Sequence, residues 1–184
     1  MDAPTPKLKQ WTFQFGTWNM LSRKYNSTNS LVPKFPFTDG LMALEKLDIL
    51  ALQETHCDDS GPPKSHHSIT LTHSGISHIA AGIALLTPAN SSWSCTMSHT
   101  LVPGHALLAQ LYHKKSTKTI WVLCAYADSS CLVDFYNDLV ISLSSFIVSL
   151  PEGTWTGCIT LGDWNMVEHP HDHTPQKAPD SVFH

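Results

Sequence analysis

Leu47-Asp48-Ile49-Leu50-Ala51-Leu52-Gln53-Glu54-Thr55-His56 is the stretch that decides the fold, because an apolar run changes abruptly there to polar residues. Residues 47–52 are apolar apart from one aspartate, and polar residues bound them on both sides. A short run of this kind is typical of a strand buried on both faces. The stretch therefore predicts a central strand, with a polar group, residues 53–56, at the end of it.

Two similar pentapeptides lie near opposite ends of the chain. Gly16-Thr17-Trp18-Asn19-Met20 closes an alternating, aromatic-rich stretch, residues 11–18, which predicts a strand. Gly162-Asp163-Trp164-Asn165-Met166 closes a short buried strand predicted over residues 158–162. The two pentapeptides share four of five residues. Such a repeat suggests two matched halves, each with an Asn after its strand.

The remaining chain alternates strand and helix patterns. Further strands are predicted over residues 81–87, 105–112 and 119–126, with a weaker one within residues 57–78. A Lys-rich tip, residues 114–118, joins two of them as a hairpin. Thr38 and Asp39 are N-cap candidates for a short helix that ends near Lys46. Apolar residues at helical spacing predict a second helix over residues 132–150. Its core-facing side is predicted to hold Leu132, Phe135, Tyr136, Leu139, Val140 and Leu143.

Interleaved helices and strands predict a two-layer or sandwich α/β architecture. Hydrophobic residues make up 42% of the 184-residue chain, which is enough for a packed core. No linker divides the chain. We therefore predict a flexible N-terminus over residues 1–10 and one domain over residues 11–184.

Composition excludes several classes of protein. The formal net charge is −4, so a protein that grips long nucleic acid through a global positive field is excluded. The five cysteines are scattered without a CxxC pair, which favours free thiols over a disulfide framework. We find no signal peptide and predict no transmembrane segment. The expected location is intracellular, nuclear or cytoplasmic.

The polar groups at the predicted strand ends have the chemistry of a metal site. Carboxylate and amide oxygens are the ligands that Mg²⁺ prefers, and it keeps water in its other positions. Two carboxylates and an asparagine beside a scissile phosphate can hold a metal and orient a water molecule. Each motif alone is also compatible with ordinary turn residues at a strand end.

Taken in order, these motifs resemble the endonuclease/exonuclease/phosphatase family. The resemblance runs from about residue 13 to residue 172. Its Gln-Glu-Thr-His form, residues 53–56, and its Gly-Asp-Trp-Asn-Met-Val-Glu string, residues 162–168, look most like the endonuclease of fungal non-LTR retrotransposons. The resemblance implies a DNase I-like fold, a four-layer β-sandwich flanked by helices.

The resemblance also implies a role for each matching residue. Glu54 would be the main Mg²⁺ ligand, with Asn19 close to the metal and Mn²⁺ as a possible substitute. Tyr126 would contact the phosphate. Asp163 would orient or deprotonate the attacking water, and Asn165 would hold that water or a phosphate oxygen.

The sequence departs from the family pattern at several positions. The family has a terminal Ser-Asp-His strand that does not occur before His184, so we expect a C-terminally truncated domain. Asp172 and His173 stand where the family usually has Asp-Arg, and His105 stands where relatives often have Arg. We assign these three residues to substrate binding. Arg23 is the single arginine beside twelve histidines, which suggests arginine codons lost in a decayed retroelement reading frame.

These observations leave three functions open. The first is a Mg²⁺-dependent endonuclease that binds nucleic acid, with DNA favoured over RNA and no membrane or obligate protein partner. The second is a non-catalytic remnant of a retroelement. The third is another phosphoesterase of the same family, acting on RNA, inositol phosphates or lipids. We expect the isolated chain to be inactive or weak.

Overall fold

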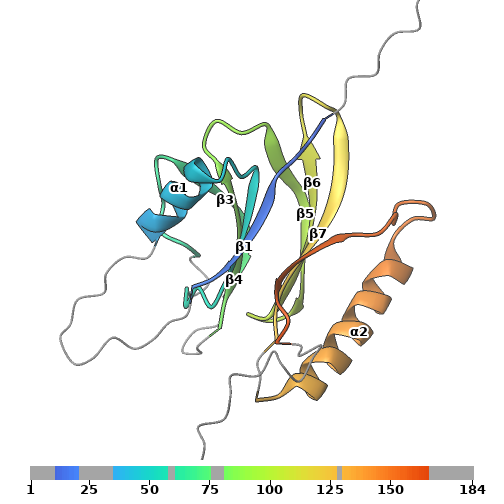
Figure 1. Cartoon of the computed structure of the whole chain (residues 1–184). Coiled ribbons are helices and arrows are strands. Elements are labelled where there is room, and N and C mark those ends of the chain that lie inside the picture. The colour runs from blue at the N-terminus through green and yellow to red at the C-terminus, as the bar shows by residue number, and fades with distance from the viewer. Residues whose placement is uncertain (1–10, 21–34, 58–60, 76–80, 128–129, 166–184) are drawn as a thin grey trace, which may run out of the picture.

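The computed structural model describes residues 11–20, 35–57, 61–75, 81–127 and 130–165. Within these ranges, two four-stranded sheets pack face to face, and a helix covers the outer face of each one (Figure 1). The result is a sandwich of four layers, helix, sheet, sheet and helix. The predicted α/β sandwich flanked by helices is confirmed.

The first sheet has the strand order β1-β2-β4-β3. Its members are β1 (Phe15–Asn19), β2 (Ile49–Gln53), β4 (Ile83–Pro88) and β3 (Ser68–Ser74). β1 runs parallel to β2, whereas β4 is antiparallel to both of its neighbours. Every residue of β2 is buried, as its apolar sequence predicts.

The second sheet has the strand order β5-β6-β7-β8. Its members are β5 (Trp93–Val102), β6 (Ala106–His113), β7 (Lys118–Tyr126) and β8 (Ile159–Asp163). β5, β6 and β7 form an antiparallel meander, and β8 joins β7 in parallel. β1 and β8 are thus edge strands of different sheets, and they lie side by side (blue and red in Figure 1).

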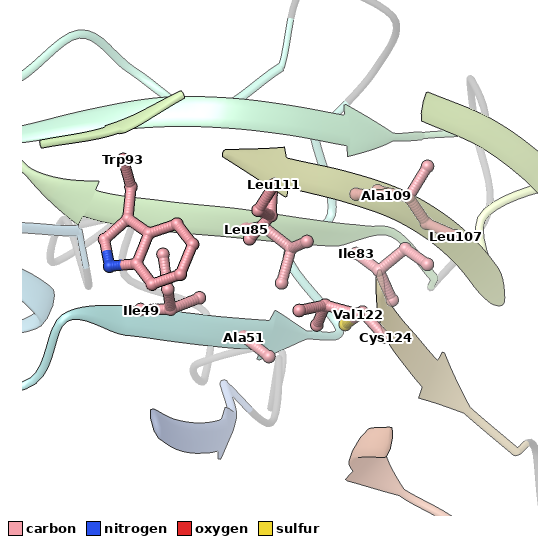
Figure 2. Close-up of a cluster of buried hydrophobic side chains, with 10 residues drawn as sticks. All are labelled: Ile49, Ala51, Ile83, Leu85, Trp93, Leu107, Ala109, Leu111, Val122 and Cys124. Atoms are coloured by element: carbon pink, nitrogen blue, oxygen red, sulfur yellow. The ribbon is translucent and has the colours of Figure 1, made fainter. Parts of the chain in front are cut away.

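The main core lies between the two sheets. Figure 2 shows its ten buried members, which come from both sheets, with Trp93 at one end and Cys124 near the other. They are Ile49, Ala51, Ile83, Leu85, Trp93, Leu107, Ala109, Leu111, Val122 and Cys124. Because both sheets contribute alternate side chains to this layer, the layer fixes how the sheets are placed relative to each other.

Each helix covers the outer face of one sheet. α1 (Phe35–Leu44) contributes Met42 to a cluster with Leu50 and Leu86 of the first sheet. α2 (Leu132–Ser149) packs Phe135 and Leu139 against the second sheet. By length and composition alone α2 could cross a membrane. Its packing on the sheet is instead that of a helix that covers a core.

Four expectations about these elements were wrong. Residues 158–162 were predicted to form a buried strand, but β8 is an edge strand without a fully buried residue. β5 was not predicted, because the polar side chains of this edge strand hide its pattern and most of them are exposed. α1 begins at Phe35, so Thr38 and Asp39 lie inside the helix rather than at its cap; Pro36 suits the first turn. Val140 was placed on the buried face of α2, but its side chain is 62% exposed.

Adjacent residues of α2 provide a test of this packing. Leu139→Ala should lower the free energy of unfolding by about 2–5 kcal/mol, because it opens a cavity against the second sheet. Val140→Ala removes an exposed side chain and should change it by less than about 0.5 kcal/mol. Urea unfolding of both variants measures the difference. Equal effects would show that α2 does not pack as described.

Candidate active site

Parallel pairing brings four strand ends to the same side of the sandwich. In the first sheet, Asn19 at the end of β1 is in register with Gln53 at the end of β2. In the second sheet, Tyr126 at the end of β7 is in register with Asp163 at the end of β8. Because β1 and β8 lie side by side, polar side chains from both sheets meet at one edge.

The side-chain amide of Asn19 joins the two carboxylates of this edge. Its Nδ2 atom donates one hydrogen bond to Glu54 Oε1 and another to Asp163 Oδ2, each 2.9 Å long. Glu54 belongs to the first sheet and Asp163 to the second, so one amide spans the junction between the sheets. Two carboxylates held this close are unfavourable unless cations or donors offset their repulsion.

A tight turn after β2 presents Glu54. Its φ angle is +51°, and a left-handed backbone is uncommon for a residue with a side chain. The turn is held because Thr55 N–H donates to Gly82 O at 3.0 Å. Gly82 is required there, since a Cβ atom would lie 2.5 Å from Thr55 Oγ1. The Glu54 side chain is 15% exposed, and His56 Nε2 lies 4.0 Å from its Oε2.

A second turn, after β8, presents Asp163 and Asn165. The backbone N–H of Asn165 donates to Asp163 Oδ1 at 3.1 Å, and Asn165 has a φ angle of +46°. The side chain of Asn165 donates to the carbonyl of Ala127, just beyond β7. Ala127 N–H in turn donates to Asp163 O at 2.9 Å. Together these bonds leave the second carboxylate oxygen of Asp163 directed at Asn19.

The pentapeptide repeat is not used symmetrically. Asn19 is the fourth residue of its pentapeptide and meets Asp163, which is the second residue of the other. Asn165, the counterpart of Asn19, bonds to Ala127 instead. The matched halves that the repeat suggested are present, because each sheet pairs one edge strand in parallel and its other strands antiparallel in the same order. The two Asn side chains nevertheless bond differently, because β1 extends to Asn19 whereas β8 already ends at Asp163.

Tyr126 and His105 form the wall of the site on the second sheet. Their rings are stacked, with centroids 5.6 Å apart and planes 10° apart. His105 Nδ1 lies 3.1 Å from the carbonyl oxygen of Tyr126, so a proton on Nδ1 makes a hydrogen bond there. Among the predicted substrate-binding residues, Asp172 and His173 lie outside the described residues.

Tyr136 supports the second turn, although its spacing in the sequence assigned it to the core. Its hydroxyl donates to the carbonyl of Trp164 at 2.6 Å, and the two rings are stacked with centroids 6.4 Å apart. Burial, together with the charge of Asp163, raises the pKa of Tyr136. Only the approach of α2 to the end of β8 reveals this contact, so no sequence pattern could have identified it.

Gln53 is buried directly beneath the site, with an exposed fraction of 1%. Its Oε1 accepts a hydrogen bond from Thr17 Oγ1 at 3.0 Å, and its Nε2 donates to Cys124 Sγ at 3.6 Å. Cys124 is also buried, and burial raises the pKa of its thiol to about 12. All five cysteines are free thiols, as their spacing predicted.

The thiol of Cys124 should be inert in the folded protein. At pH 8 we expect a maleimide to label exposed Cys131 within minutes and Cys124 only after unfolding, as mass spectrometry of peptides can show. The pKa of Cys124 is higher in the folded protein than in the unfolded chain, so alkaline pH favours unfolding. The contribution of this thiol to stability is complete below its ordinary pKa of 9.0 and is lost as the pH rises to about 12. Rapid labelling of native Cys124 would contradict its burial.

The donor set suits a hard divalent cation better than a transition metal. In the described part of the chain, no three His, Cys, Asp or Glu side chains gather closely enough to hold a metal by themselves. Two carboxylates and an amide do converge. This set fits Mg²⁺, which needs one or two carboxylates and retains water. Glu54 would supply a carboxylate oxygen to such a cation, and Asn19 could supply only its Oδ1, because its Nδ2 donates to the two carboxylates.

Comparison with solved structures gives the same fold at low sequence identity. The matches include AP endonuclease LMAP from Leishmania major, with a TM-score of 0.59, 17% identity and coverage of 88% of this chain and 58% of that one. The 3′ phosphatase NExo from Neisseria, bound to product DNA hairpin, matches with a TM-score of 0.58, 18% identity and coverage of 88% and 61%. A humanized D. rerio TDP2 matches with a TM-score of 0.53, 16% identity and coverage of 83% and 62%.

The fold is DNase I-like. It is the fold of the endonuclease/exonuclease/phosphatase superfamily that the sequence motifs resemble. The chain spans about three-fifths of the length of these structures. No family model matches the sequence, and no curated protein matches it. In this DNase I-like sandwich the convergent polar edge is the candidate active site.

Proposed function

We propose that this protein carries the active centre of a metal-dependent phosphodiesterase that acts on nucleic acid. The observation that carries the proposal is the Asn19 amide, which joins Glu54 of one sheet to Asp163 of the other. Such an edge of strand ends is where α/β folds bind their ligands. It combines the two functions that hydrolysis of a phosphodiester requires, a cation site and a base beside it.

The roles proposed for the individual residues are those that the family resemblance implies. Glu54 and Asn19 hold the cation, Mg²⁺ or Mn²⁺, which when bound polarises the phosphate and lowers the pKa of water. Asp163 accepts the proton of the attacking water, and Asn165 orients that water or a phosphate oxygen. Tyr126 contacts the phosphate from the second sheet. The hydrogen bond from Asn19 fixes which oxygen of Asp163 faces inward.

Nucleic acid, with DNA favoured over RNA, is the proposed substrate. The solved structures with this fold include one bound to a DNA hairpin. The protein has a net charge of −4, and the Lys-rich tip between β6 and β7 lies at the opposite end of those strands from Tyr126. Binding therefore depends on local contacts at the site, where His105 stacks on Tyr126.

We further propose that the protein is an endonuclease of retroelement origin. The resemblance of residues 162–168 to retrotransposon endonucleases supports this origin. His105 and His173 would then occupy positions that were once arginines. Arginine binds phosphate through two parallel hydrogen bonds that neutral imidazole cannot reproduce, so His105→Arg should raise nucleic-acid affinity and steepen its salt dependence. Related genomic copies with His at both positions would contradict the decay of arginine codons.

The second candidate is a non-catalytic remnant of a retroelement, and the single arginine of the sequence, Arg23, beside twelve histidines favours it. For such a remnant we expect weak hydrolysis or none. The third alternative, a phosphoesterase for RNA, inositol phosphates or lipids, shares the same site and differs only in the substrate.

The deciding experiment separates metal binding from hydrolysis. Mn²⁺ binding to the 184-residue chain is measured by calorimetry, and cleavage is measured on supercoiled plasmid, single-stranded DNA and RNA with and without Mg²⁺. Binding with slow Mg²⁺-dependent nicking of DNA supports the proposal. Binding without cleavage of any substrate supports the remnant. Absence of both binding and cleavage would overturn the assignment of this site.

A further inference from the structure

Gln53 is a buried polar side chain that the proposed chemistry does not use. It lies at the end of β2 with both polar atoms of its amide hydrogen-bonded to protein. Its neighbours in the core include Ala51 and Ile83, which offer no alternative partners. A buried amide that loses such bonds is destabilised by its lost hydration, so the two bonds hold its position firmly.

The bonds of Gln53 reach the strands that carry the site. Thr17, which donates to its side chain, lies two residues before Asn19 on β1. The backbone carbonyl of Gln53 accepts the N–H of Met20, the residue after Asn19, at 2.9 Å. Cys124, which accepts from its side chain, lies two residues before Tyr126 on β7. Residues two apart on a strand face the same side of a sheet.

The direction of each bond is set by its donor. The Thr17 hydroxyl donates to the amide oxygen, which orients the amide nitrogen toward the second sheet. The thiol of Cys124 stays protonated, and its S–H points to the carbonyl of Leu52 at 3.8 Å. The result is a polar chain from β1 through β2 to β7. It crosses an otherwise apolar layer immediately below the polar edge.

We propose that Gln53 is a positioning residue. Its bond to Thr17 on β1 keeps Asn19 beside Glu54, where the cation would bind, and its bond to Cys124 fixes this half of the candidate site relative to the half on the second sheet. The Asn19–Glu54 half belongs to the first sheet and the Tyr126–Asp163 half to the second. Apolar side chains can slide against one another, whereas a hydrogen-bonded bridge specifies one arrangement. This inference rests on the proposed function, because it assigns the bridge to the same site.

A matched control exists within the same sheet. Thr87 on β4 is also 1% exposed, and its hydroxyl donates one hydrogen bond, to the carbonyl of Asp48 at 2.9 Å. Its bond joins β4 to the residue before β2, at the opposite end of these strands from the site, and does not reach the second sheet. Thr87→Val therefore reproduces the loss of a buried hydrogen bond without disturbing the bridge.

The experiment compares Mn²⁺ affinity and melting temperature in the full chain. Gln53→Met keeps the size of the side chain but removes both bonds. We expect both Gln53→Met and Thr87→Val to lower the melting temperature. Only Gln53→Met should weaken Mn²⁺ binding, by about tenfold, which is the usual effect of removing a support of metal ligands.

A second pair of variants decides the matter if Gln53→Met does not fold. Cys124→Ser keeps an acceptor for Gln53 and should retain Mn²⁺ affinity, whereas Cys124→Ala should lose it to the same extent as Gln53→Met. If the wild type binds Mn²⁺ and all these variants bind it equally well, the inference is overturned and the proposed function stays intact. A wild-type chain that binds no Mn²⁺ would overturn the metal site itself, and the positioning role with it.

Discussion

Glu54→Gln should abolish measurable Mn²⁺ binding and reduce Mg²⁺-dependent cleavage by a factor of about 10² to 10³. The substitution preserves the shape of the side chain, so its oxygen can still accept the hydrogen bond from Asn19 Nδ2. What disappears is the negative charge, on which a hard cation depends. The loss is therefore electrostatic rather than structural, and the melting temperature should change little.

The control for this prediction is Glu152→Gln. Glu152 is an exposed glutamate in the turn between α2 and β8, so its replacement removes the same charge away from the site. It should leave calorimetric Mn²⁺ binding unchanged. If both variants bind Mn²⁺ as the wild type does, Glu54 is not a ligand. If both lose binding equally, the effect is one of overall charge rather than of the site.

Gly162→Ala should prevent stable folding, with a loss of at least about 3 kcal/mol in the free energy of unfolding. A Cβ atom at this position would overlap the carbonyl oxygen of Ala125 and lie 2.8 Å from its carbon. The obstacle is the backbone of the paired strand β7, which no change of rotamer can relieve. The φ angle of +151° adds strain for any residue with a side chain.

Gly153→Ala separates these two causes. Gly153 also has a positive φ angle, +77°, but nothing lies within 4 Å of its hypothetical Cβ atom. We expect it to cost about 1 kcal/mol from the backbone alone. Chemical unfolding of both variants measures the difference. A Gly162→Ala variant as stable as Gly153→Ala would show that β8 does not pair with β7 so closely.

Local patterns were sufficient to predict most elements but not all of them. The apolar run before Gln53 identified β2, and the Lys-rich turn identified the hairpin of β6 and β7. Both signals depend on neighbouring residues in the chain. The sequence patterns did not predict β5, because a mostly exposed edge strand needs only a paired neighbour, β6, and little hydrophobic pattern of its own.

The sequence by itself determined which residues could carry the chemistry. Glu54 and Asp163 each follow an apolar strand, and the order of the motifs indicated the fold before any coordinates did. The fold was predicted correctly because the end of a strand and the character of a side chain are local properties. The same reasoning could not assign the pairing of the two pentapeptides, since their four shared residues suggested a symmetry that the site does not have.

Only the tertiary structure decided how these residues meet. Asn19 bridges Glu54 and Asp163, and Gln53 reaches Cys124, in contacts that cross from one sheet to the other. Tyr136 supports Trp164 in a contact between a helix and a distant turn. Such contacts depend on how two sheets and a helix pack in three dimensions. A chain specifies that packing through the sum of many weak apolar contacts, which no single stretch of sequence contains.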